Sequence, residues 1–171
     1  LDETVLQARI GESGSCEVDV NCDASWTTAS SAVARMLFTD TGSSYLCSGT
    51  LLNDRGSTGT PNFLSANHCI STQASASSLQ TYWFYKSTSC NVRALSTQTA
   101  TRTGGATLLY ASSSTDTSFM RLSSAPPAGV TYAGWSTTSP TVGLSVASIH
   151  HPRGDLQKIS YGTISTYQSC R

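Results

Sequence analysis

The sequence predicts an all-β protein made of short antiparallel strands. Residues such as Val, Thr, Phe and Tyr gather in short runs, and Gly, Ser and Asn fill the intervals between them. Only residues 71–78, rich in Ala and Ser, favour a short helical turn. The runs are residues 32–38, 48–52, 62–65, 79–85, 106–110 and 117–122. Their spacing is typical of an antiparallel barrel or sandwich.

A domain boundary is expected at residues 123–130, where Pro126, Pro127 and Gly129 stop strand pairing. We therefore expect residues 1–122 to form an N-terminal extension and a first barrel, and residues 131–171 to begin a second. The strand candidates beyond the linker are residues 131–135, 142–149 and 158–164. These three are too few to close a barrel of their own.

Composition excludes several classes of function. Lys and Arg total 10 and Asp and Glu total 10 among 171 residues, so bulk charge predicts no binding to nucleic acid or to an acidic membrane. No apolar run approaches the ~20 residues that cross a bilayer. Residues 1–3 do not begin a signal peptide, so we expect a mature, soluble chain. The 6 cysteines include no Cys-x-x-Cys pair and indicate an oxidising, extracellular compartment, hence a secreted protein.

The sequence predicts neither a metal nor a cofactor. The adjacent potential ligands are His68 with Cys69 and His150 with His151. Neighbours on a strand point to opposite faces, so neither pair converges on one ion. We expect His150 and His151 to lie at a strand end and to cap the turn that follows.

The strongest candidate for chemistry is His68. It is the next-to-last residue of the run F-L-S-A-N-H-C at 63–69, one hairpin after the Y-L-C-S-G-T-L-L-N of residues 45–53. An imidazole beside Cys69, with Cys47 upstream, is expected on a strand edge held by a disulfide and directed to solvent, as proton transfer requires. The alternative is a structural histidine, and the flanking Cys69 argues against it because a disulfide there would fix the ring's orientation.

This stretch resembles the histidine loop of chymotrypsin-fold serine proteases, and within them the secreted bacterial lysyl endopeptidases. The likeness runs from Gly11 almost to the end of the chain. Its other motifs are G-E-S-G-S-C-E-V-D-V-N-C at 11–22, T-Y-W-F-Y at 81–85, A-G-W at 133–135, I-H-H-P at 149–152 and K-I-S at 158–160. It implies a chymotrypsin-like double antiparallel β-barrel, with the first barrel complete and the second only begun in this chain.

Asp116 is the candidate for orienting His68. Because Asp116 is surrounded by Ser and Thr residues, the residues alone fit an ordinary turn or N-cap aspartate as well as they fit a catalytic one. The resemblance favours the catalytic role, because Asp116 opens a strand that matches the family's aspartate segment. Asp40, Asp54 and Asp155 lie in turns or polar loops and are less apt.

The resemblance implies disulfides Cys47–Cys69 and Cys22–Cys90. The first closes the loop that carries the histidine, which the chain-entropy model values at about 3 kcal/mol. Cys16 and Cys170 are left without evident partners and are expected to tether a second chain.

The nucleophile is not in this sequence. No Gly-Asp-Ser-Gly follows His68, and Ser13 in G-E-S-G precedes both the histidine and Asp116, contrary to the order of this fold. The chain alone is expected to be inert. Ending at Arg171, as after a cut beside a basic residue, it is expected to be one chain of a protease whose C-terminal chain carries the serine. The alternative is a fragment of a longer protease, and the unpaired Cys16 and Cys170 favour the two-chain arrangement.

The predicted function is secreted serine endopeptidase activity on peptides or proteins, with trypsin-like cleavage after Lys or Arg. Lys86 and Lys158 are the only lysines, a weak hint of lysine preference. The alternative is a protease-like binding module that has lost its nucleophile. Hydrolysis by a cysteine is excluded because Cys47 and Cys69 are expected to form the disulfide.

Overall fold

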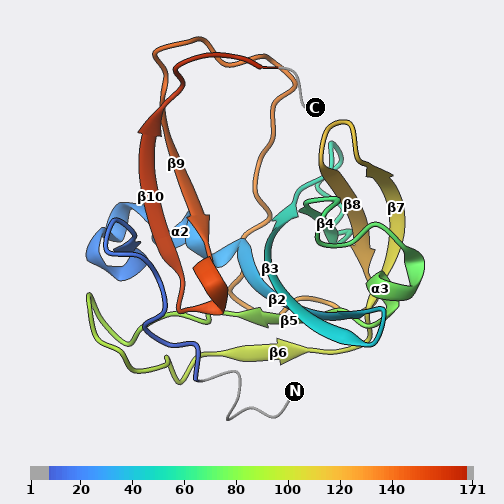
Figure 1. Ribbon diagram of the computed structural model, residues 1–171, viewed down its shortest axis with the longest axis horizontal. Helices are drawn as coiled ribbons and strands as arrows, with labels where there is room; N and C mark the ends of the chain where they lie inside the picture. The colour runs from blue at the N-terminus through green and yellow to red at the C-terminus, as the bar shows by residue number, and fades with distance from the viewer. Residues whose placement is uncertain (1–7, 169–171) are drawn as a thin grey trace.

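A computed structural model describes residues 8–168 and consists mostly of β-strands in two antiparallel sheets (Figure 1). The larger sheet has seven strands in the order β6-β5-β2-β3-β4-β8-β7. Its strands are β2 Val33–Asp40, β3 Ser43–Leu52, β4 Asn62–Ser65, β5 Gln80–Trp83, β6 Ala100–Arg102, β7 Ala106–Ser112 and β8 Thr117–Leu122. The sheet curves strongly, with β6 and β7 as its edges in the described part of the chain. This architecture agrees with the all-β, chymotrypsin-like fold that the sequence predicts.

The smaller sheet has the order β1-β10-β9 and stands beside the larger one (Figure 1). Its strands are β1 Val18–Asp19, β9 Ser145–His150 and β10 Lys158–Thr163. Since Val18 lies opposite Ile159, the N-terminal segment pairs with a strand from the far end of the chain. The first and last thirds of the sequence are therefore joined in one sheet.

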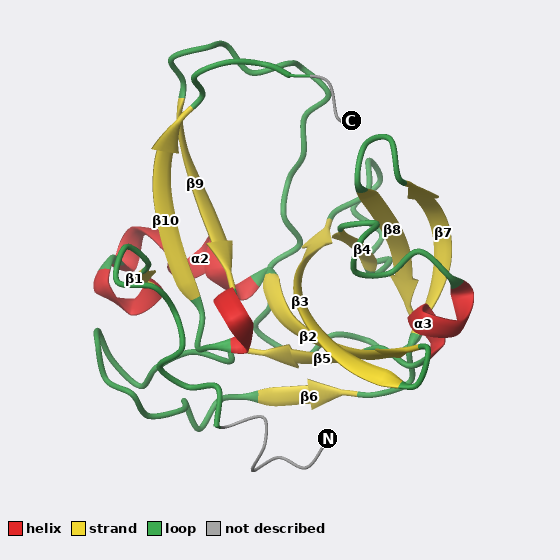
Figure 2. Cartoon of the chain, in the orientation of Figure 1, coloured by secondary structure: helices red, strands yellow, loops and turns green. Residues whose placement is uncertain are grey.

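Helices are short and lie at the margins of the sheets (Figure 2). Among them, α3 falls within the helical turn expected at residues 71–78, and the Thr72 side chain caps it by accepting the N–H of Ser75. The helices are η1 Val20–Cys22, η2 Ala24–Trp26, α2 Thr27–Ser31, α3 Gln73–Ser77 and η3 Pro152–Gly154. In the part of the chain that the structure describes, no helix has the length and apolar character needed to cross a bilayer.

Two predicted strands match the structure residue for residue, namely 62–65 as β4 and 117–122 as β8. The expected strand at 131–135 is wrong. That segment makes one isolated parallel bridge, between Leu52 and Ala133, and the Trp135 indole donates a hydrogen bond to the Asn53 carbonyl. Among the described residues no further strand pairing extends this bridge, so the segment is a connection that contacts the larger sheet at Leu52 and does not form a strand.

The main core fills the concave side of the curved sheet, where the Phe63 and Trp83 rings meet edge to face at 6.0 Å. Gly49 of β3 is required there, because an added Cβ would lie 2.3 Å from a ring carbon of Phe63. The most deeply buried apolar residues are Ala34, Met36, Leu51, Phe63, Ile70, Ala76, Trp83 and Met120. This packing fixes β4, the strand that leads into the histidine loop.

The turn after β9 is held by a buried histidine. His151 is 4% exposed, and its Nδ1 lies 3.1 Å from the carbonyl oxygen of Asp155 at the far end of η3. A carbonyl only accepts, so this nitrogen carries the proton. Burial lowers the pKa of His151 to about 3, so the ring is neutral. His150 lies 3.2 Å from Glu17. The vicinal histidines thus join the turn and the N-terminal segment, in agreement with the structural role expected for them.

Candidate active site

His68 and Asp116 are brought together by the pairing of β4 with β8. Ser65 at the end of β4 lies opposite Ser118 in β8, so the loop after β4 and the turn before β8 share one edge of the sheet. The Asn67 N–H donates to the Asp116 carbonyl at 3.1 Å, which ties the two segments together through the backbone. Two residues far apart in the sequence therefore become neighbours.

The Asp116 carboxylate makes two hydrogen bonds to His68. The His68 backbone N–H donates to Oδ1 at 2.9 Å, and Nδ1 of the ring lies 2.7 Å from Oδ2. These contacts lower the pKa of Asp116, with the backbone N–H of His68 the largest cause and its ring the next. An ionised carboxylate only accepts, so Nδ1 carries the proton and Nε2 keeps its lone pair. Nε2 can therefore act as a base.

The backbone at Asp116 is left-handed, with φ at 48°. Aspartate is one of the few residues other than glycine that adopts this conformation readily. The turn that reverses the chain from β7 into β8 thus places the carboxylate beneath the imidazole.

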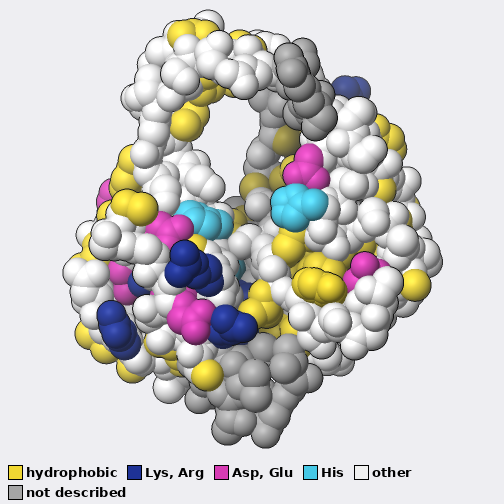
Figure 3. Space-filling model, viewed as in Figure 1, with side chains coloured by type: hydrophobic (Ala, Val, Ile, Leu, Met, Phe, Trp, Pro, Cys, Tyr) yellow, Lys and Arg dark blue, Asp and Glu magenta, His cyan; other side chains and the backbone are white. Residues whose placement is uncertain are grey.

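Both side chains are open to solvent, with 71% of the His68 side chain and 48% of the Asp116 side chain exposed. Figure 3 shows a histidine flanked by an acidic side chain on the viewed face, with hydrophobic side chains below it. The carboxylate is thus half exposed rather than enclosed. Its orientation comes from the backbone hydrogen bond and the tight turn rather than from enclosure.

The Cys47–Cys69 disulfide holds the other flank of the histidine. It links β3 to the residue that directly follows His68, across a sequence separation of 22. The Cys69 N–H also donates to the Ala66 carbonyl at 3.1 Å, which makes the histidine loop a compact turn. Because both sulfurs are in the disulfide, the cluster of Cys47, His68 and Cys69 does not offer thiolates to a metal ion.

Comparison with known proteins identifies the family. Residues 10–171 match the family model described as "Lysyl endopeptidase, C-terminal domain". The chain belongs to the lysyl endopeptidase family. It is 44% identical over 164 residues, 91% of its length, to a Lysyl endopeptidase of Pseudomonas aeruginosa. It is also 29% identical over 110 residues, 61% of its length, to Secreted RxLR effector protein 73 of Plasmopara viticola. It spans 36% of the first relative and 26% of the second.

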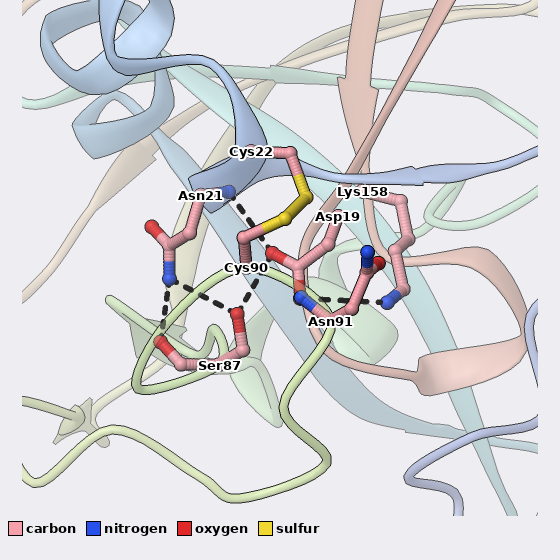
Figure 4. The surroundings of a disulfide bond; sticks show 7 residues. All are labelled: Asp19, Asn21, Cys22, Ser87, Cys90, Asn91 and Lys158. Carbon is pink, nitrogen blue, oxygen red and sulfur yellow. Dashed lines mark hydrogen bonds and ion pairs between the residues drawn. A yellow bond between two sulfur atoms is a disulfide. The ribbon is translucent and has the colours of Figure 1, made fainter.

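Membership of the lysyl endopeptidase family confirms the resemblance and makes this chain protease-related. The Cys22–Cys90 pair that the family resemblance implies is present, across a sequence separation of 68 (Figure 4). Around it, a buried Asp19 carboxylate gathers side chains and backbone from the N-terminal segment, the β5–β6 connection and β10. These partners are Asn21, Ser87, Asn91 and Lys158. This second disulfide joins the N-terminal segment to the larger sheet and has no contact with the histidine loop among the interactions described.

The competing aspartates of this lysyl endopeptidase domain have other partners. Asp40 accepts the Ser75 hydroxyl at 2.8 Å, and Asp54 accepts N–H groups of its own loop. Asp155 accepts the N–H of Gly11 and that of Ser13. Asp116 is thus the carboxylate bonded to His68.

Ser13 and Cys16 both lie in the N-terminal segment, which Asp155 binds through the backbone N–H groups of Gly11 and Ser13. The contact of Ser13 is a structural one, because its backbone N–H donates to Asp155. Cys16 is exposed and has a free thiol. Cys170 lies outside the described residues. A feature that the sequence did not predict is a cavity beside His68, whose lining comes from β2, β3 and the disulfide.

Proposed function

We propose that this chain carries the general base and its orienting carboxylate for a secreted serine endopeptidase. The observation that supports this most is the 2.7 Å contact between Nδ1 of His68 and Oδ2 of Asp116, combined with the open exposure of the ring. Family membership supports the same class of reaction. The two disulfides are typical of proteins that work outside the cell.

The chemistry follows from the state of the imidazole. Nε2 of His68 takes the proton of a serine hydroxyl while the serine oxygen bonds to the carbonyl carbon of the peptide. Asp116 stabilises the imidazolium that forms. The imidazolium then gives its proton to the leaving amine as the C–N bond breaks. Water hydrolyses the resulting ester through the same base.

The serine, the backbone donors for the oxyanion and the pocket that reads the substrate side chain are supplied from beyond this sequence. We place them on a C-terminal chain of the same protease, tethered through Cys16 and Cys170. In this proposal residues 1–122 complete the first barrel, residues 123–130 link, and residues 131–171 begin the second. Cleavage follows a Lys or Arg residue of a peptide or protein substrate, and the name of the Pseudomonas relative supports Lys.

A phosphonylating reagent for active-site serines tests this proposal on the purified protein with its accompanying polypeptides. One serine on the accompanying chain should be labelled, and His68→Ala should abolish labelling. His150→Ala is the matched control, because that histidine is bonded to Glu17 rather than to Asp116. If no serine is labelled on any chain, the binding module is supported instead.

Two further measurements refine the proposal. Intact mass with and without reductant should reveal the tethered polypeptide, and a single mass in both conditions would exclude the two-chain arrangement. A panel of Lys, Arg, Glu and Phe reporter substrates should be cleaved only after Lys or Arg.

A further inference from the structure

A cavity of about 380 Å³ opens beside His68. Its described lining residues are Phe38, Asp40, Tyr45, Leu46, Cys47, His68 and Cys69. Since the histidine itself forms part of the wall, a side chain held in this cavity lies next to the bond that His68 would act on. The cavity is therefore placed to read a substrate residue.

Aromatic rings and a disulfide form part of the cavity wall. The Phe38 and Tyr45 rings stack at 5.9 Å with an angle of 25° between their planes. Phe38 is buried, whereas Tyr45 is 46% exposed and offers its ring to a ligand. The sulfurs of Cys47 and Cys69 add polarizable surface near the histidine. A long methylene chain would pack well against these groups.

The one formal charge in the described lining, apart from a protonated histidine, is the Asp40 carboxylate. Asp40 ends β2 and lies opposite Ser43 across a two-residue turn, in which Thr41 and Gly42 both have positive φ. The Ser75 hydroxyl donates to Oδ1 of Asp40 at 2.8 Å and fixes the carboxylate. A negative group thus stands at a defined position in a cavity whose other walls include the Tyr45 ring and the disulfide.

We infer that this cavity is a substrate subsite that prefers a lysine or arginine side chain at a position close to the scissile bond. The inference rests on the proposed function, and it names a second basic residue of the substrate in addition to the one before the cut. The methylene stem packs on Tyr45 and the disulfide, and the cationic end pairs with Asp40. A cation near an exposed tyrosine ring gains a further attraction from the ring face.

Hydrolysis by the complete protease tests the preference. Peptides carry Lys, Arg, Met or Glu at one position at a time on either side of the bond. Asp40→Asn removes the charge and keeps an oxygen for the Ser75 hydroxyl. At one position, the ratio of kcat/KM for Lys over Met should fall about 2- to 5-fold in this variant, the scale of an exposed ion pair. Asp40→Lys should favour Glu there instead. Asp54→Asn, which removes one charge from a different loop, should leave every ratio unchanged.

A binding measurement separates this inference from the proposed function. The chain is titrated with N-acetyl-lysine methylamide and N-acetyl-methionine methylamide while the NMR signals of Tyr45 and His68 are followed. The lysine compound should shift both residues more than the methionine compound, and Asp40→Asn should remove the difference.

The outcomes are distinct. If no peptide is hydrolysed but lysine binding depends on Asp40, the proposed function fails and the subsite stands. If the lysine and methionine compounds shift the wild-type signals equally, the subsite is overturned. It is also overturned if hydrolysis proceeds with ratios that Asp40→Asn leaves unaltered.

Discussion

Removal of each disulfide in turn should affect the unfolding free energy and kcat in opposite orders. Cys47–Cys69 joins residues 22 apart and Cys22–Cys90 joins residues 68 apart. The loop-closure relation gives about 3.4 kcal/mol for the shorter loop and about 4.4 kcal/mol for the longer one at 25 °C. The double variant Cys22→Ala with Cys90→Ala is therefore expected to lose about 1 kcal/mol more unfolding free energy than Cys47→Ala with Cys69→Ala.

The loss of kcat should be larger for the variant that lacks Cys47–Cys69 than for the one that lacks Cys22–Cys90. Cys69 directly follows His68, so loss of Cys47–Cys69 frees the loop that orients the imidazole. A displacement of about 1 Å in such a group can cost about 100-fold in rate. The Cys22–Cys90 bond anchors the N-terminal segment instead, so its loss should lower kcat less than about 3-fold in molecules that are folded.

Urea unfolding of the chain, followed by the fluorescence of buried Trp83, gives the stabilities. Hydrolysis by the complete protease gives kcat, normalised to the folded fraction from near-UV circular dichroism. If the variant that lacks Cys22–Cys90 loses as much kcat as the one that lacks Cys47–Cys69, the specific orienting role of Cys47–Cys69 is wrong.

Three other predictions follow from single residues. Asp116→Asn should keep the turn, since Asn also tolerates positive φ, but lower kcat about 10⁴-fold by favouring the wrong tautomer of His68; an unchanged kcat in steady-state assays would contradict this. Stability should fall as the pH drops from 6.5 toward 3, because His151 has a pKa of about 3 when folded and the unfolded chain binds its proton first; urea unfolding of His151→Asn should show a shallower decline, and equal slopes would refute it. Gly49→Ala should lower the unfolding free energy by about 1–3 kcal/mol, because the new methyl group meets Phe63; thermal unfolding at an unaltered midpoint would disprove the clash.

Most strands of the larger sheet could be predicted because their residue types and their alternation are typical of β-strands. In Thr117–Leu122 buried residues alternate with residues that are partly or fully exposed, as in a half-buried strand. Ala100–Arg102 was missed because three residues carry too little pattern to be distinguished from a loop. The helices between β1 and β2 were missed as well, although Asp19 caps η1 by accepting the N–H of Asn21 and Asp23 caps η2 by accepting that of Ser25. An aspartate at the N-cap position is the sequence feature that could have indicated these helices.

The site was predictable only in part. The motif around His68 pointed to a base, but the residues around Asp116 fitted an ordinary turn equally well, and the family resemblance made the choice. The decisive fact, the register of Ser65 with Ser118, is a long-range pairing that local sequence does not encode. The cavity beside His68 escaped prediction for the same reason, since its walls come from separate strands.

The central claim is that Asp116 holds the His68 ring with its proton on Nδ1, leaving Nε2 free to act as a base. Nitrogen-15 NMR of the labelled imidazole measures this directly in the neutral ring. We predict a protonated Nδ1 and an unprotonated Nε2, with the Nδ1 proton signal moved strongly downfield and lost in Asp116→Ala. A proton on Nε2, or a signal that Asp116→Ala leaves in place, would contradict the account.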